Sequence, residues 1–146
     1  MTDEILQTIP HRPPFLLVDR IVELAEDKIT TEKLISPDES FFAGHYPGNP
    51  VMPGVLVCEA VFQSGALLVA KKIESEAPGK KPGGFPVLTR IREAKFKKMV
   101  LPGDLLEMEA EITEKLGSAY FMKGTARVKG LVSVRVKFAA TLVENR

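Results

Sequence analysis

The chain has 146 residues, of which 45% are hydrophobic and 27% are charged, so an intrinsically disordered chain is excluded and one domain over residues 1–146 is expected. Its net charge of +1 at pH 7 excludes an overall attraction to nucleic acid, and no nucleic-acid partner is expected. Its single cysteine, Cys58, excludes an internal disulfide.

The first third of the chain predicts a short helical turn and then a β-hairpin. Residues 3–9 have the spacing of one amphipathic helical turn. The polar residues at the start lack the basic and apolar regions of a signal peptide, so a cytoplasmic location is expected. Two apolar runs, 16–24 and 29–35, flank a turn at 25–27, which predicts an antiparallel pair of strands.

A loop rich in proline and glycine follows the hairpin. Pro47, Pro50 and Pro53 recur at every third residue with glycines between them. This composition excludes regular secondary structure while it holds the backbone stiffly. His45, one of two histidines, lies in this loop, so the loop is expected to position it.

The segment 54–73 predicts one long helix that begins at Pro53, where proline fits the first helical turn. Within 55–70 the sole charged residue is Glu59. A buried carboxyl that is ionised and unpaired costs on the order of several kcal/mol, so Glu59 is expected to have a partner or a proton-transfer role. Burial would raise its pKa and the helix N-terminus would lower it, and the sequence does not decide between the two effects.

The same helix is apolar on nearly every side, so it has to be enclosed by other parts of the protein. One sheet face covers only part of such a helix, so a symmetric homodimer is expected to cover the remainder. A transmembrane role is disfavoured, because the apolar run is shorter than a bilayer requires and carries Glu59, Gln63 and Ser64.

The second half of the chain alternates between apolar and polar residues. Segments 106–113, 120–129 and 132–143 predict three strands, joined at Gly117 and Gly130 as an antiparallel meander. Segment 85–100 is also extended, but its apolar phase shifts by one residue, which predicts a bulge near Glu93. Residues 77–84 are expected to be a mobile connection between the helix and the sheet.

The loop and the helix together have the composition of an active site. The unpaired N–H groups of Gly54 and Val55 at the helix start can hold a carbonyl oxygen. For a thioester, each such donor would stabilise the developing enolate by about 3 kcal/mol. His45 is then a candidate base for the adjacent carbon, and Glu59 a candidate proton donor. Gln63 lies four residues after Glu59 on the same helix face and can hydrogen-bond to it.

Three motifs occur in the order found in a known family. They are PHRPPFLLVDR at 10–20, GHYPGNPVMPG at 44–54 together with Glu59-Ala60 and Gln63, and KFKKMVLPGD at 95–104. They resemble the bacterial 3-hydroxyacyl-[acyl-carrier-protein] dehydratases of the FabZ type over nearly the whole chain. The resemblance implies an α+β hot-dog fold, in which an antiparallel sheet wraps a long central helix. It also implies dimers whose active sites take the histidine from one subunit and the glutamate from the other, and which often assemble as trimers into hexamers.

The resemblance further implies the reaction, which is removal of water from a (3R)-3-hydroxyacyl thioester to give the trans-2-enoyl thioester in type II fatty acid biosynthesis. His45 would remove the C2 proton, Glu59 would protonate the leaving hydroxyl group, and the Gly54 N–H would bind the thioester oxygen. No metal or organic cofactor is implied. The acyl tunnel, or its support, is assigned to Met52, Val55, Phe62 and Gln63.

An acidic acyl carrier protein is the implied partner. Lys95, Lys97 and Lys98 are the candidate docking residues. Further basic residues offer material for the same patch: Lys71, Lys72, Lys80, Lys81, Arg90 and Arg92.

Several positions depart from the usual family pattern. Val61-Phe62 stands where Met-Ala is common, which leaves the accepted chain length open, and Met99 replaces a common proline. Tyr46 replaces a common phenylalanine. Arg135 and Lys137 lie where acidic residues are frequent, so a specialised pathway is also compatible.

Other functions remain open on the sequence alone. A dehydratase/isomerase, an enoyl-CoA hydratase, a thioesterase or a catalytically silent acyl-binding subunit would share the fold. His11 is interpreted as structural. Cys58 is interpreted as a core thiol, because adjacent helix residues point about 100° apart and Cys58 therefore does not easily share the site of Glu59. His45 and Glu59 lack the third ligand that a typical metal site needs. Residues 79–84 lack the ending of a phosphate-binding loop.

Overall fold

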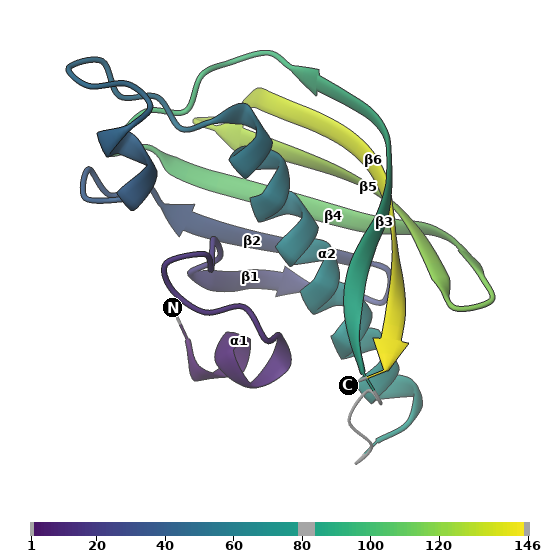
Figure 1. The fold of residues 1–146 in the computed structure, drawn as a ribbon. Coiled ribbons are helices and arrows are strands. Elements are labelled where there is room, and N and C mark those ends of the chain that lie inside the picture. The colour runs from purple at the N-terminus through teal and green to yellow at the C-terminus, as the bar shows by residue number, and fades with distance from the viewer. Residues whose placement is uncertain (1, 79–83, 145–146) are drawn as a thin grey trace.

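A computed structural model describes residues 2–78 and 84–144 of the chain. Its six strands form one antiparallel sheet in the order β1-β2-β4-β5-β6-β3, which curves around the long helix α2 (Figure 1). This is the α+β hot-dog arrangement that the motifs imply. The elements are α1 (Asp3–Thr8), β1 (Arg20–Leu24), β2 (Lys28–Leu34), the 3-10 helix η1 (Ser40–Ala43), α2 (Gly54–Glu76), β3 (Gly84–Phe96), β4 (Leu105–Leu116), β5 (Ala119–Val128) and β6 (Leu131–Glu144).

Helix α2 begins where the sequence predicts and continues for three residues beyond the predicted end at Ile73. It is long and apolar enough to cross a membrane, but 67% of its most apolar window is buried within the fold. It is therefore the core helix of this protein rather than a membrane span. Its contact with the sheet is close, because a Cβ atom placed on Gly124 of β5 would lie 2.2 Å from Cγ1 of Val61.

The predicted meander is confirmed as β4, β5 and β6. The register pairs Ala110 with Gly124, and Met122 with Phe138. The predicted bulge is confirmed between Ile91 and Glu93, and a second irregularity that was not predicted lies between Leu88 and Arg90. Strand β3 ends at residue 96, four residues before the predicted end. The backbone N–H groups of Lys97 and Lys98 both donate to the Ser133 carbonyl, which breaks the regular pairing with β6.

The N-terminal hairpin is confirmed for β1 and β2, but its predicted start at residue 16 is wrong. Leu16, Leu17 and Val18 are all buried, whereas a strand exposes alternate residues to opposite faces. These residues form an irregular segment instead, and the Leu17 N–H donates to the side chain of Gln63. The predicted helical turn at the N-terminus is confirmed as α1. Of the expected connection at 77–84, residues 79–83 lie outside the described residues, and Lys80 and Lys81 are among them.

Candidate active site

The loop before α2 holds His45 in one defined orientation. The Val51 N–H donates to the His45 carbonyl at 2.9 Å, and Nδ1 of the His45 ring lies 2.7 Å from the Val51 carbonyl oxygen. A carbonyl oxygen only accepts hydrogen bonds, so Nδ1 carries the proton. In the neutral imidazole, Nε2 is then free to accept a proton, which is what a general base requires. The Tyr46 ring stacks on the imidazole, and the two ring centroids lie 4.1 Å apart.

The start of α2 presents backbone donors next to this loop. The Pro53 carbonyl accepts the first helical hydrogen bonds, from Leu56 at 2.9 Å and Val57 at 3.1 Å. The N–H groups of Gly54 and Val55 therefore precede the first bonded turn, where helix donors have no partner within the helix. A Cβ atom at residue 54 would lie 2.7 Å from the Phe96 ring, so any larger residue there would require this ring to move.

Two of the predicted tunnel residues flank the same helix start. Met52 is buried, and its N–H donates to the Val100 carbonyl at 2.9 Å, which fixes the end of the loop. Val55 is 69% exposed, which is unusual for a valine on an apolar helix. With Glu59 and Phe62 it forms a partly exposed stripe at helical spacing on α2.

Glu59 lies on the second turn of α2 and is partly buried. Burial raises the pKa of this carboxyl above its ordinary value, and the hydrogen bond from Gln63 opposes the rise without cancelling it. The direction agrees with the effect of burial that the sequence analysis named, and the group that opposes it here is Gln63. A carboxyl group with a raised pKa keeps its proton closer to neutral pH, as a general acid must.

His11 approaches Glu59, although the sequence gave it a structural interpretation only. Its Nε2 atom lies 3.9 Å from Oε2 of Glu59. Its Nδ1 atom is buried and has no hydrogen-bond partner among the described residues. Burial, and to a lesser extent the positive charge of Arg12, lower the pKa of His11. Sequence reasoning missed this proximity because it depends on a contact between segments far apart in the chain; the motif at 10–20 was the available signal.

Phe62 and Cys58 also lie on α2, and both pack within the fold. The Phe62 ring packs against Phe138 with ring centroids 4.8 Å apart, so it belongs to the wall between α2 and the sheet. Cys58 is buried as predicted, and burial raises the pKa of its thiol, which makes it a poor nucleophile. In the described ranges 2–78 and 84–144, no three His, Cys, Asp or Glu residues gather as a metal site would need.

The basic residues proposed for docking lie near the end of β3. Lys95 forms an ion pair with Glu93 at 3.4 Å, and Lys97 and Lys98 follow as exposed residues. Lys71 and Lys72 are instead engaged near the other end of α2, by Glu4 at 2.9 Å and by Asp27 at 2.7 Å.

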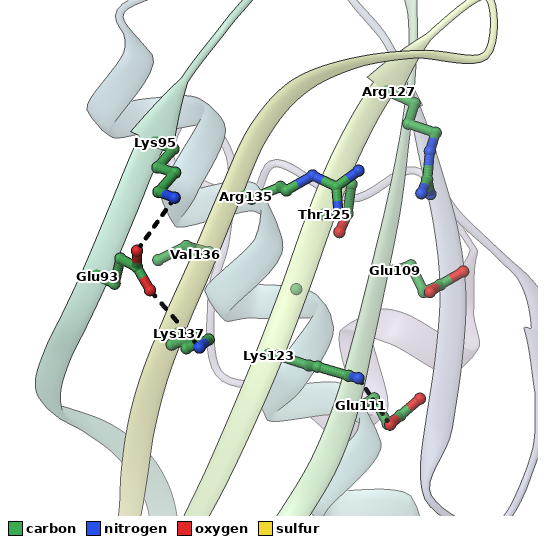
Figure 2. Close-up of a pocket in the computed structure, with 11 residues that line it drawn as sticks. Glu93, Lys95, Glu109, Glu111, Lys123, Thr125, Arg127, Arg135, Val136 and Lys137 are labelled. Atoms are coloured by element: carbon green, nitrogen blue, oxygen red, sulfur yellow. Dashed lines mark ion pairs between the residues drawn. The ribbon is translucent and has the colours of Figure 1, made fainter.

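The face of the sheet that points away from α2 carries a charged hollow of about 340 Å³ (Figure 2). Its three carboxylates are paired: Glu93 with Lys95 and Lys137, Glu109 with Lys28, and Glu111 with Lys123. The sheet separates this hollow from Glu59 on α2, so it is not the predicted active site. Its lining comprises Glu93, Lys95, Glu109, Glu111, Lys123, Gly124, Thr125, Arg127, Arg135, Val136 and Lys137.

Comparison with known proteins agrees with these observations. The family model of the FabA-like domain matches residues 9–137. A relative from Caulobacter sp. (strain K31) is 44% identical over 142 residues, which cover 97% of this chain and 85% of the relative. A relative from Myxococcus xanthus (strain DK1622) is 45% identical over 142 residues, which cover 97% and 90%. Both carry the name 3-hydroxyacyl-[acyl-carrier-protein] dehydratase FabZ.

A solved structure supports the fold independently. The dehydratase heterocomplex ApeI:P from Xenorhabdus doucetiae matches with a TM-score of 0.81 over 97% of this chain and 91% of that chain. At 14% identity this match shows a shared fold alone. Together with the close relatives, the findings place the chain: it belongs to the FabA-like family, among the FabZ-type 3-hydroxyacyl-[acyl-carrier-protein] dehydratases.

Proposed function

We propose that this protein, as one catalytic domain over residues 1–146, removes water from (3R)-3-hydroxyacyl-[acyl-carrier-protein] to give the trans-2-enoyl thioester in type II fatty acid biosynthesis. The observation that carries the proposal is the identity of about 44% with FabZ dehydratases over 97% of the chain. The partly buried carboxyl of Glu59, whose pKa is raised, supports it chemically.

Each step of the reaction has a candidate group. Nε2 of His45 takes the C2 proton of the substrate, while Glu59 gives its proton to the C3 hydroxyl group. The C3–O bond breaks, water leaves, and the double bond forms between C2 and C3. The Gly54 N–H holds the thioester oxygen while negative charge develops on it. One proton then passes from His45 to solvent and one returns to Glu59, which restores the enzyme.

The complete site is proposed to form between two copies of the chain. Strand β3 is an edge strand, since it pairs with β6 on one side only within the described sheet. Ile91 and Phe96 on this edge are 53% and 56% exposed. Long edge strands with exposed apolar residues tend to pair with another chain. Such a partner would also cover Val55 and Phe62 on α2, and would bring the histidine of one subunit toward the glutamate of the other.

Family membership supports the proposals for the partner, the location and the higher assembly. An acyl carrier protein would deliver the substrate, with Lys95, Lys97 and Lys98 near the end of β3 as the docking residues. Such docking should weaken as salt is added, because it depends on exposed charges. Three dimers assembling into a hexamer, and a cytoplasmic location, are proposed on the same basis.

The test compares the purified protein with single-residue variants on 3-hydroxyacyl-[acyl-carrier-protein]. His45→Ala and Glu59→Gln should each lose at least about a hundredfold in rate while remaining folded, as loss of a general acid or base does. Tyr46→Phe keeps the stacked ring and should retain near-normal activity, so it serves as the matched control. Near-normal rates for His45→Ala or Glu59→Gln would overturn the assignment. Isomerised products, hydrolysed thioester, activity restricted to coenzyme A thioesters, or no activity would identify the alternative functions.

A further inference from the structure

The buried side chain of Gln63 makes three hydrogen bonds that together fix its orientation. It is 1% exposed. Its Oε1 atom accepts from the Leu17 N–H at 2.7 Å, and its Nε2 atom donates to the Phe15 carbonyl at 2.9 Å. The second hydrogen on Nε2 faces Oε2 of Glu59, also at 2.9 Å. Every hydrogen bond of the Gln63 NH₂ group is therefore used.

The amide of Gln63 cannot be reversed at this position. Reversal would place the NH₂ group against the Leu17 N–H and the carbonyl oxygen against the Phe15 carbonyl. Two donors would then face each other, as would two acceptors, and both buried bonds would be lost. The backbone of Phe15 and Leu17, residues 48 and 46 positions away in sequence, thus decides which end of the amide meets Glu59.

This orientation has a consequence for the carboxyl group. The amide NH₂ group donates and does not accept, so the oxygen that it faces has to be an acceptor. The carbonyl oxygen of a carboxylic acid is a stronger acceptor than its hydroxyl oxygen, so the hydrogen bond from Gln63 to Oε2 favours protonation of Glu59 on Oε1. Nε2 of His11 lies on the Oε2 side as well, 3.9 Å away.

We propose that Gln63 is a positioning residue that keeps Oε2 of Glu59 as an acceptor and leaves Oε1 as the atom that delivers the proton to substrate. This assignment rests on the proposed function for the identity of the reaction, but the hydrogen-bond geometry does not depend on it. The motif at 10–20 takes part in this positioning, because the backbone of Phe15 and Leu17 holds the Gln63 side chain.

The neighbours of Glu59 define what a titration should detect. Within 4 Å, His11 is the one basic side chain that the described residues bring to Glu59, and it comes from the segment before β1. Arg12 in the same segment is held by the Leu6, Ile9 and His11 carbonyls. The hydrogen bond from Gln63 favours the ionised form of Glu59 and lowers its pKa, against the effect of burial. Loss of that donor should therefore move the Glu59 titration to higher pH.

The first measurement follows the wild-type protein by NMR, with ¹⁵N-labelled glutamine and ¹³C-labelled glutamate. One of the two Nε2 hydrogens of Gln63 should shift with the same midpoint as the Glu59 carboxyl carbon, and the other should not. Glu59→Gln identifies the carboxyl signal by its absence. Two hydrogens that both ignore the Glu59 titration would overturn the proposal, whatever the variants do.

The second measurement compares Gln63→Met, Gln63→Glu and the control Ser64→Ala. Gln63→Glu keeps an acceptor for the Leu17 N–H, so it serves if Gln63→Met does not fold. Ser64 is also buried on α2, but it bonds to Thr31 and the Ala60 carbonyl rather than to Glu59. Both Gln63 variants should move the midpoint of the Glu59 titration to higher pH, while Ser64→Ala should leave that midpoint unchanged. An unchanged midpoint in a folded Gln63 variant would contradict the proposal.

Kinetics separate this proposal from the proposed function. Gln63→Met should lower kcat by about tenfold or more, the usual effect of one lost hydrogen bond to a reacting group, and move the basic limb of its pH profile to higher pH. An inactive wild-type protein with coupled NMR titrations would sink the proposed function and leave the Gln63 assignment intact. An active wild-type protein with an unshifted basic limb in Gln63→Met would do the reverse.

Discussion

At Glu59, burial and hydrogen bonding act on one carboxyl group in opposite directions. Burial raises the pKa, and the amide of Gln63 lowers it by a smaller amount. The sequence shows an isolated carboxyl in an apolar helix, and from that an unusual pKa can be predicted. The balance of the two effects cannot, because it depends on how Gln63 is held by the backbone of Phe15 and Leu17.

The raised pKa of Glu59 predicts how its removal affects stability. Because the folded-state pKa lies above the ordinary value of 4.5, the folded protein binds more protons between the two values. The contribution of Glu59 to the free energy of unfolding therefore falls as pH rises through this window. Glu59→Gln should be more stable than the wild type at pH 8 and no more stable at pH 4.

Urea denaturation at the two pH values, at one fixed protein concentration, measures this difference. Asp38→Asn is a suitable control, because Asp38 is exposed and lies outside the site. A stability gain for Glu59→Gln that is the same at pH 4 and pH 8 would contradict the account of Glu59.

At the scale of elements, the close approach of α2 to β5 depends on Gly124. A Cβ atom there would meet Cγ1 of Val61 at 2.2 Å and the Glu109 carbonyl oxygen at 3.0 Å. Gly124→Ala should therefore lower the free energy of unfolding by about 1–3 kcal/mol, as overpacking of a core does. Adding Val61→Ala should recover part of that loss. Gly44→Ala is the matched control, because nothing lies within 4 Å of a Cβ atom there.

Thermal or urea denaturation of the wild type, the three single variants and the double variant checks this packing. If Gly124→Ala matched the wild type in stability, or if Val61→Ala added its full cost to that of Gly124→Ala, the helix and the sheet would not be in the contact described.

The strands show which elements can be predicted from sequence. Alternation predicted the meander of β4, β5 and β6, because one face of that sheet packs on α2 and the other faces solvent. The prediction of a strand failed at residues 16–18, which are three consecutive apolar residues buried in an irregular segment. Apolar residues report burial, and only their spacing reports a strand; that run has no alternation.

At the scale of the whole molecule, the exposed edge of β3 predicts the assembly. Ile91→Glu should place a charge in the proposed interface, so the dimer should dissociate and activity should fall by about a hundredfold or more, since each site would lose its partner residue. Leu131→Glu is the control, because Leu131 is equally exposed but begins β6, away from the free edge. Light scattering after gel filtration measures the mass, and an Ile91→Glu variant that stayed dimeric would refute this interface.

In the candidate site, too, residues close together in the sequence could be predicted, whereas contacts between distant segments could not. His45, Gly54 and Glu59 lie within one loop and the helix that follows, so the motif and its spacing were enough to select them. The approach of His11 to Glu59 required the fold, because the two residues come from separate segments. The role of a second subunit depends on how two copies of the chain pack together, which the order of residues in one copy does not specify.

The most direct test of a shared His45 and Glu59 site mixes two inactive variants. His45→Ala and Glu59→Gln are co-expressed, purified together and assayed on 3-hydroxyacyl-[acyl-carrier-protein]. With random pairing, half of the dimers are mixed and each mixed dimer keeps one intact site of two, so about one quarter of the wild-type rate should return. No recovery in verified mixed dimers would contradict the account, because both groups would then have to come from the same chain.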